Sequence, residues 1–205
     1  MFRAVAMAFG MAVAGVAAVG GGAAGAAGAA APCAIGTWTM TWQSVVFEGT
    51  FEDKRVTTTH GGSTGTRLII GPKTMKLDFS KSTKQNISFG YDGTGGFEIY
   101  RGSFTAGLMR TGNTKGKLTV VNKTAKGDAT ASYTQETPER AEGITYDVDE
   151  PLRTAVKPSR YWDSLAITRG DYTCSKKTLK ITRSTSGDSG GFVHTGTFDY
   201  TFTRA

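Results

Sequence analysis

The chain of 205 residues has few residues of the kinds that carry most enzymatic chemistry. It contains two histidines, His60 and His194, which leaves few candidates for a general base. Its two cysteines, Cys33 and Cys174, lie far apart in the sequence and form no C-x-x-C redox motif. Proline is also scarce, with five residues, and the sequence shows almost no helical periodicity. These absences argue against a helical protein and against a redox enzyme.

Alternation of apolar and polar residues is present almost everywhere instead. In the stretch GTWTMTWQSV, Trp38, Met40 and Trp42 alternate with threonines. Near the C-terminus, Phe198, Tyr200 and Phe202 alternate with polar residues in the same way. A period of two predicts β-strands with one apolar face each.

The predicted strands are short and follow one another with mostly short connections. Such a meander can close into an up-and-down barrel, which leaves no unpaired strand edge. A sandwich is the alternative, but its Greek-key crossings need longer connections. The sequence therefore predicts one all-β domain over residues 32–205, an antiparallel barrel of about 8–10 strands.

Residues 1–31 have the composition of a secretory signal peptide. Arg3 precedes an apolar run rich in alanine and glycine, and small residues follow that run. We expect a secreted protein with no integral membrane span after cleavage. Lipid attachment at Cys33 is disfavoured because Pro32 precedes it. In an oxidising compartment, Cys33 and Cys174 are expected to form a structural disulfide.

The excess of positive charge gives no clear indication of a polyanionic partner. The chain has 24 lysines and arginines against 17 acidic residues, a formal net charge of +7 that falls to +6 when Arg3 is removed. The basic residues are scattered among acidic ones, which is typical of a solvated surface. We expect a monomer that does not bind nucleic acid.

The stretch GDSGG at residues 187–191 matches the sequence around the nucleophilic serine of chymotrypsin-like proteases. Neither His60 nor His194 has the sequence context of that family's catalytic histidine, and we expect both to lie far from Ser189. Only residues 192–205 follow the motif, which is too short to build that family's specificity pocket. We interpret GDSGG as a hairpin loop between the last two strands, and we predict no catalytic residue.

Two ends of the predicted barrel resemble a known family. The Gly-x-Trp stretch at Gly36 and Trp38 is similar to the motif that opens lipocalins and related calycins. The resemblance implies that Arg204, on the last strand, stacks over Trp38 and helps to close the barrel. The stretches CAIGTW and TFTRA are also similar to avidins, whose biotin pocket needs further tryptophans on later strands than this chain supplies.

One long segment, residues 135–163, shows no clear strand pattern and carries three of the five prolines. A loop of this length is usually functional or disordered, and this one could cover a barrel mouth. We place Tyr161 and Trp162 at that mouth. Asp147, Asp149 and Glu150 lack the spacing of a calcium loop, and we predict no metal site and no cofactor.

The leading hypothesis from the sequence is a secreted, non-catalytic barrel that binds a small, mostly apolar ligand. An extracellular or cell-envelope interaction protein that uses the barrel as a scaffold is the alternative, and a GDSGG-based hydrolase is the third reading. His194 has the parity of the apolar face, where we expect a hydrogen-bonded structural or rim histidine. The residues expected to line the cavity are Trp38, Trp42, Tyr161, Trp162, Phe198, Tyr200 and Phe202.

Overall fold

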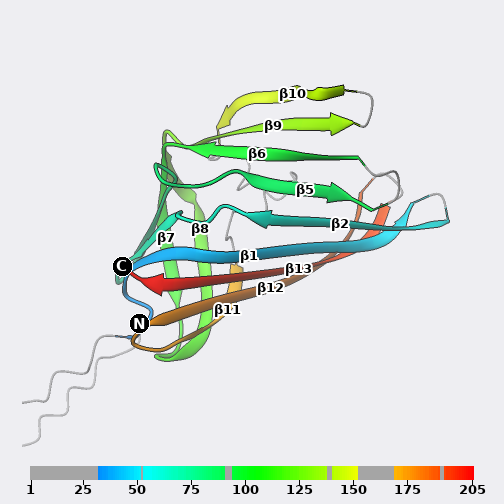
Figure 1. Ribbon diagram of the computed structural model, residues 1–205. Coiled ribbons are helices and arrows are strands. Elements are labelled where there is room, and N and C mark those ends of the chain that lie inside the picture. Colours follow the sequence, from blue (N-terminus) through cyan, green and yellow to red (C-terminus); the bar gives the residue numbers. More distant parts are fainter. Residues whose placement is uncertain (1–31, 52, 91–93, 138–139, 152–168, 190–191) are drawn as a thin grey trace, which may run out of the picture. The chain divides into compact units, whose positions relative to one another are not determined.

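Antiparallel β-strands make up the regular structure of the chain in a computed structural model (Figure 1). The structure describes residues 32–205 except 52, 91–93, 138–139, 152–168 and 190–191. No helix occurs among these residues, and hence none that is long and apolar enough to cross a membrane. The described strands are β1 (Gly36–Phe51), β2 (Lys54–Gly62), β3 (Arg67–Ile70), β4 (Thr74–Asp78), β5 (Gln85–Phe89), β6 (Gly95–Arg101), β7 (Ser103–Arg110), β8 (Lys115–Gly127), β9 (Thr130–Thr137), β10 (Arg140–Pro151), β11 (Arg169–Cys174), β12 (Thr178–Ser189) and β13 (Phe192–Arg204).

Eight of these strands close into a barrel. In chain order they are β1, β3, β4, β7, β8, β11, β12 and β13, and each pairs antiparallel with the next. β13 closes the ring by pairing antiparallel with β1, beginning with Trp38 opposite Arg204. The predicted fold class, an antiparallel up-and-down barrel, is confirmed.

The other five strands form an extension sheet outside this ring. Their order is β10, β9, β6, β5 and β2, and β2 joins the sheet to β1. Figure 1 shows these strands stacked in that order above β1. β1 serves both parts of the fold, because residues 36–39 pair with β3 and residues 44–51 pair with β2. The barrel and the extension sheet therefore share one continuous strand.

Strands that follow one another directly in the chain are divided between the ring and the extension sheet. This holds for β2 and β3, β4 and β5, β6 and β7, and β8 and β9: one strand of each pair belongs to the ring and the other to the extension sheet. Glycines with positive φ occur at three of the breaks between these strands, and Gly62 and Gly102 are two of them. Gly62 has φ +117°, and a Cβ there would lie 2.5 Å from the Lys84 carbonyl oxygen; Gly102 has φ +70°. Both conformations favour glycine because other residues meet steric strain there.

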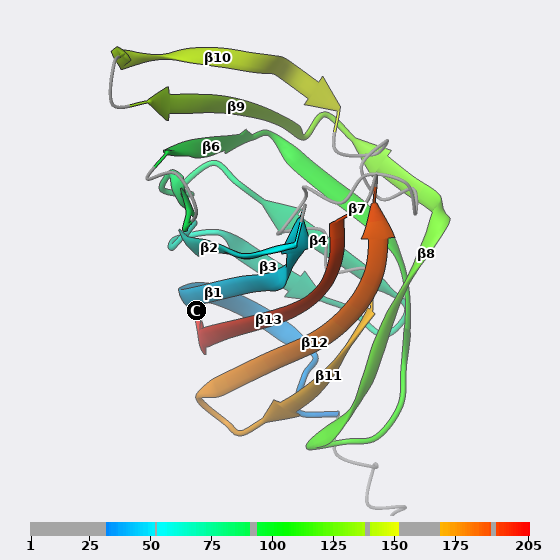
Figure 2. The ribbon, with the colours of Figure 1, turned by 90° about the vertical axis from the view of Figure 1, so that its right-hand side faces the viewer.

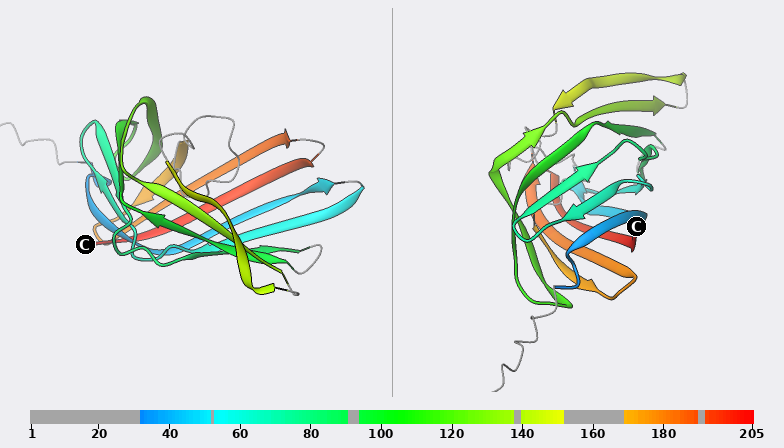
Figure 3. Two further views of the ribbon diagram at one scale, coloured as in Figure 1. Left: turned by 90° about the horizontal axis from the view of Figure 1, so that it is seen from above. Right: turned by 90° about the vertical axis from the view of Figure 1, so that its left-hand side faces the viewer.

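Within the described residues, the strands close into a ring at one end only. At the ring end, which carries the turns after β3, β7 and β11, every neighbour is paired. At the opposite end, where β1, β5, β9 and β12 end, no pairing joins β10 to β12 within the described residues. Figures 2 and 3 show the long strands β12 and β13 curving away from the ring toward this second end. We call it the open end.

The apolar core lies inside the ring and continues under the extension sheet. Trp38, Leu179, Ile181 and Phe202 are fully shielded from solvent. Beneath the extension sheet, the ring of Tyr100 on β6 stacks on the ring of Phe79, with 5.4 Å between the ring centroids. One continuous cluster of buried side chains therefore joins the two parts.

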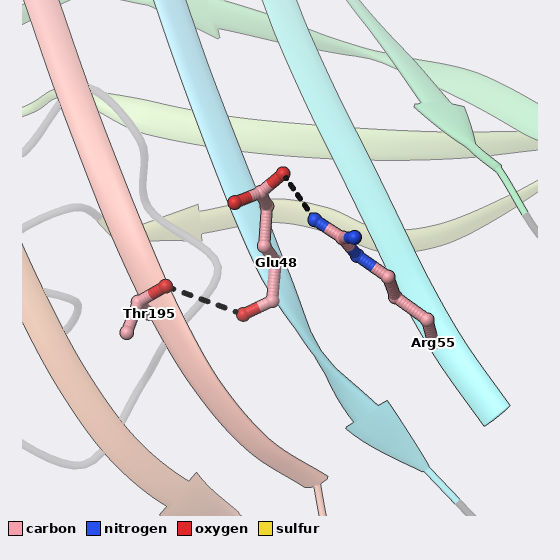
Figure 4. A network of polar contacts seen from close by, with 3 residues as sticks. All are labelled: Glu48, Arg55 and Thr195. Carbon is pink, nitrogen blue, oxygen red and sulfur yellow. Dashed lines mark hydrogen bonds and ion pairs between the residues drawn. The ribbon is translucent and has the colours of Figure 1, made fainter. Parts of the chain in front are cut away.

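On the outer face, polar contacts tie three adjacent strands near the open end (Figure 4). Arg55 Nη2 on β2 lies 3.3 Å from Glu48 Oε1 on β1. Thr195 Oγ1 on β13 donates to the Glu48 carbonyl oxygen at 3.4 Å. Both side chains of the ion pair are more than half exposed, so the pair stabilises the fold only slightly.

The segment predicted to be irregular, residues 135–163, is partly regular, and that prediction was wrong for its first part. β9 continues to Thr137, and β10 runs from Arg140 to Pro151 and pairs with it. The alternation of Ile144, Tyr146 and Val148 with polar residues is the strand signal. Residues 152–163, with the predicted rim aromatics Tyr161 and Trp162, lie outside the described residues.

Candidate functional site

The residues predicted to close the barrel meet at the ring end. The Arg204 guanidinium lies over the Trp38 ring, with Cζ 4.3 Å from the ring centroid, so the predicted cation–π contact is confirmed. Arg204 Nη2 also donates to the Cys33 carbonyl oxygen at 2.9 Å. Gly36 leaves the space for this guanidinium, because a Cβ at that position would lie 2.6 Å from Arg204 Nη1. This arrangement gives the Gly-x-Trp stretch a structural explanation.

The predicted disulfide is also present at the ring end. Cys33 and Cys174 are bonded, with 6.1 Å between their Cα atoms. The bond fixes the segment before β1 to the end of β11. Together with Arg204, it holds both ends of the described chain against the closed end of the barrel.

Three of the predicted cavity residues besides Trp38 face the interior. Phe198, Tyr200 and Phe202 on β13 are all buried. His194 on the same strand is buried too, as its parity predicted. The Phe47 ring packs edge-on against three rings, with centroid distances of 5.7 Å to His60, 6.0 Å to His194 and 5.4 Å to Phe198. An aromatic wall therefore extends along the interior from the ring toward the open end.

The prediction that Trp42 lines the cavity was wrong. Half of the Trp42 surface is exposed to solvent. The cause is a bulge in β1: Met40 pairs with Phe202, but Trp42 pairs with Thr201, so the side-chain alternation shifts by one residue. Gln43 takes the inward position instead, opposite Tyr200, and is 3% exposed.

This shift brings a polar side chain into a buried polar cluster that the sequence pattern did not predict. Its members come from β1, β2, β5 and β6 and from the bend after β2, and all are buried: Gln43, His60, Ser63, Gln85, Glu98 and Tyr100. The ladder positions explain the assembly, since Gln85 is opposite both Gly62 on β2 and Glu98 on β6. The cluster lies where the ring passes into the extension sheet.

Gln85 is the centre of the cluster's hydrogen bonds. Its Oε1 accepts from Gln43 Nε2 at 2.9 Å and from Ser63 Oγ at 3.3 Å. Its Nε2 donates to Glu98 Oε2 at 3.1 Å and contacts His60 Nδ1 at 3.0 Å. The Tyr100 hydroxyl also donates to Glu98 Oε2. Both ends of the Gln85 amide are therefore used, which fixes its orientation.

His60 is neutral at physiological pH. Burial lowers its pKa from 6.5 to about 4, because the charged imidazolium loses its hydration. Its Nδ1 accepts the hydrogen bond from Gln85, so the single proton of the neutral ring is on Nε2. Among the described residues, His60 Nε2 and Gln43 Oε1 have no hydrogen-bond partner. A buried donor and a buried acceptor in one cluster are thus left unsatisfied.

The motif GDSGG lies where the last two strands meet, as predicted, but its first three residues belong to β12 rather than to a loop, and residues 190–191 lie outside the described residues. β12 ends at Ser189 and β13 begins at Phe192, and these two residues pair. The expectation that both histidines lie far from Ser189 was wrong for His194, which is opposite Gly187, two residues along β12. His60 lies farther from Ser189 along the sheet. Its partner on β1 is Val45, which is opposite Phe198 on β13, whereas Ser189 is opposite Phe192.

Other predicted or conceivable sites have little support in the described part of the chain. No group of three or more potential metal ligands occurs there. Asp147, Asp149 and Glu150 belong to β10, and their side chains lie outside the described residues. The large exposed apolar side chains that are described, Trp42, Met109 and Val193, are scattered over β1, β7 and β13.

Comparisons with protein-family models, with curated proteins and with solved structures gave no match.

Proposed function

We propose that the protein is a secreted, non-catalytic β-barrel that binds one small, mostly apolar ligand in its interior. The ring supplies a rigid wall that is closed at one end by Trp38 and Arg204. The disulfide between Cys33 and Cys174 is compatible with an extracellular location. A mostly apolar lining with a few convergent polar groups is the usual composition of a small-molecule site.

The observation that carries this proposal is the buried polar cluster beside the aromatic wall. A core that served stability alone would gain from apolar side chains at these positions, because unsatisfied buried polar atoms are costly. Gln43 and His60 instead hold an acceptor and a donor inside the protein without partners among the described residues. The ring of Phe47 lies against His60, so apolar and polar surfaces adjoin.

We also propose a lipocalin-like relationship. Its support is the eight-stranded ring in chain order and the stacking of Arg204 on Trp38, with glycine at position 36. The five extension strands are additional to such a ring. They contribute the buried polar side chains of β2, β5 and β6 at the junction with the ring, where a ligand's polar group would be bound.

Native mass spectrometry of the protein secreted by its own host tests ligand binding. We expect a mass above that of the polypeptide, which returns to the polypeptide mass in denaturing solvent. Extraction of the ligand should also lower the melting temperature, because a ligand that binds only the folded state stabilises it. A polypeptide mass alone, together with no binding of a fluorescent apolar dye such as 1-anilinonaphthalene-8-sulfonate, would contradict the proposal.

A labelling experiment tests the proposal that GDSGG is not catalytic. A fluorophosphonate probe reacts with activated serine nucleophiles. We expect no more labelling of the wild-type protein than of the Ser189→Ala variant. Labelling that is lost in Ser189→Ala and in His194→Asn would establish the hydrolase reading instead.

A further inference from the structure

The outward side of β12, β13, β1 and β2 is rich in serine and threonine. The ladders align these residues in rows: Ser184 on β12 is opposite Thr197 on β13. Thr197 is opposite Val46 on β1, and Val46 is opposite Thr59 on β2. Alternate residues such as Phe198 are buried, so the rows point outward. We call this surface the hydroxyl face; its serines and threonines, all at least partly exposed, are Thr39, Ser44, Thr57, Thr59, Thr178, Thr182, Ser184, Ser186, Thr195, Thr197, Thr201 and Thr203.

The hydroxyl face carries few charges, and they balance. Glu48 forms an ion pair with Arg55 (Figure 4). The other charged groups among its described side chains are Lys180 and Asp199, which have opposite signs. By contrast, the outward positions of β3, β4, β8 and β11 carry the charged residues Arg67, Lys76, Asp78, Lys115, Lys117, Arg169 and Asp171. Depletion of charged residues is a property that distinguishes recognition surfaces from the rest of a protein's exterior.

Trp42 adds one large aromatic ring to the hydroxyl face. It is opposite Thr201, and half of its surface is exposed. The bulge after Met40 turns the indole outward, whereas unbroken alternation would turn it into the barrel. An exposed indole forgoes the stabilisation that its burial would give. Exposed aromatic residues are enriched where proteins bind partners, so the position of Trp42 supports a binding role for this face.

The composition of the hydroxyl face selects an uncharged partner with many hydroxyl groups. A serine or threonine hydroxyl both donates and accepts, as a sugar hydroxyl does. The apolar face of the indole can pack against the C–H groups of a sugar ring. The rows recur every two residues, about 6.6 Å along each strand, which suits a partner built of repeating units. A charged polymer would meet no excess of opposite charge, because the acids and bases of the face balance.

We propose that the hydroxyl face binds a neutral polysaccharide, with Trp42 stacked on one sugar ring and the serine and threonine rows bonded to hydroxyl groups along the polymer. The face is on the outside of the barrel, so this interaction is independent of the interior ligand proposed above.

Retention on insoluble polysaccharides tests the proposal. The secreted protein is mixed with cellulose, chitin, β-1,3-glucan or starch at pH 7.5 in 0.5 M sodium chloride, with carboxymethyl-cellulose as the charged counterpart of cellulose. The salt screens surface charges, so a basic protein is not retained by charge alone. We expect at least one of the four neutral polymers to remove the protein from solution. Retention by none of the four, or by carboxymethyl-cellulose alone, would overturn the proposal.

Two substitutions assign the binding to the hydroxyl face. Trp42→Ala removes the aromatic ring, and Thr197→Lys places a long charged side chain in the middle of the rows. We expect each variant to bind the retained polysaccharide at least tenfold more weakly than the wild type. Met109→Ala and Thr119→Lys are the matched controls on β7 and β8, where Met109 is 60% exposed and Thr119 points outward. Both controls should bind as the wild type does.

Equal affinity of the wild type, Trp42→Ala and Thr197→Lys would place the binding elsewhere and overturn the assignment. Sedimentation velocity tests the other occupant: a dimer that Trp42→Ala dissociates would show that a second copy of the chain covers the face instead. Circular dichroism and melting curves show whether each variant is folded; both replaced side chains are outside the core, and either folded variant suffices. Binding of an apolar dye should be unchanged in both variants, so their loss of polysaccharide binding leaves the interior site unaffected.

Discussion

Gln85 determines the hydrogen-bonding state of its neighbours through one side-chain amide. It is completely buried, and its two ends contact Gln43, Ser63, His60 and Glu98. Because its nitrogen faces His60 Nδ1, the imidazole is held as the Nε2–H form, and because burial lowers the pKa of His60 to about 4, that form persists well below neutral pH. A single residue thus sets the donor that the interior presents.

The lowered pKa of His60 predicts a loss of stability in acid. The unfolded chain binds a proton at His60 below a pH of about 6.5, whereas the folded protein binds it only near pH 4. The free energy of unfolding should therefore fall as the pH falls from about 6.5 to 4, by about 3 kcal/mol from this residue, and this contribution should then level off.

Urea unfolding of the wild type and of His60→Asn between pH 4 and 7.5 checks this prediction. The carboxylates outside the polar cluster contribute equally to both proteins, so the difference between the two curves reports on His60 and the groups bonded through Gln85. We expect the wild type to lose more stability than the variant over this range. Parallel curves, or an imidazole resonance assigned to His60 that titrates near pH 6.5 in the folded protein, would contradict it.

At the scale of one strand, β1 has three structural roles, each in a different part of its length. Its first residues close the ring against β3, the bulge after Met40 turns Gln43 inward, and its second half carries the extension sheet. Gly36 at its start lies under the Arg204 guanidinium. The strand can close the barrel only while that space stays free.

Gly36→Ala should therefore destabilise the protein. The backbone there has φ +144°, and the added Cβ would lie 2.6 Å from Arg204 Nη1, so either the backbone or the stacked arginine must shift. We expect a loss of about 1–3 kcal/mol in the free energy of unfolding. Gly61→Ala on β2 is the control, because the Cβ there would meet only the Gln43 carbonyl oxygen at 3.6 Å.

Urea unfolding of both variants at neutral pH gives the comparison. Gly61→Ala should be as stable as the wild type or slightly more stable. Equal effects of the two substitutions would show that Gly36 is not required for the Arg204 contact.

Alternation predicted the strands and the closure of the ring, but not the parts of the fold that depend on interruptions of that alternation. The bulge after Met40 is not visible in a stretch where Trp38, Met40 and Trp42 alternate without a gap, so the predicted facing of Trp42 was wrong and Gln43 was missed. The cluster around Gln85 joins strands far apart in sequence. Its assembly depends on the register of β2, β5 and β6, which short-range patterns do not determine.

At the scale of the whole molecule, one antiparallel meander provides both a closed end and an end that spreads into the extension sheet. The ring end holds the disulfide, the Trp38–Arg204 stack and most of the apolar core. The polar cluster lies beyond it, toward the open end. Stability and the proposed binding site are thus concentrated in different parts of the same strands.

Removal of the disulfide should destabilise the whole unit. Cys33 and Cys174 are separated by 141 positions, and a loop of that size corresponds to about 4 to 5 kcal/mol in the chain-entropy model, with measured values usually lower. We expect the double variant Cys33→Ser, Cys174→Ser to lose about 2–5 kcal/mol and to melt at a lower temperature.

Calorimetry of the oxidised wild type, the reduced wild type and the double variant checks this. Reduction should reproduce the effect of the double substitution and should have no effect on the variant itself. If reduction leaves the melting temperature of the wild type unchanged, the bond does not contribute to folding stability.

The same disulfide also determines how the protein would respond to a pulling force applied at residues 32 and 205. The load passes from Cys33 directly to Cys174, so the strands from β1 to β11 carry no tension along their covalent path. Only the chain from Ser175 to Ala205 can be drawn out, to a contour length of roughly 100 Å. β12 and β13 would peel apart one rung at a time, because Thr178 and Thr203 pair at the loaded end. The bond therefore acts as a mechanical stop that shields the polar cluster from extension until it is reduced.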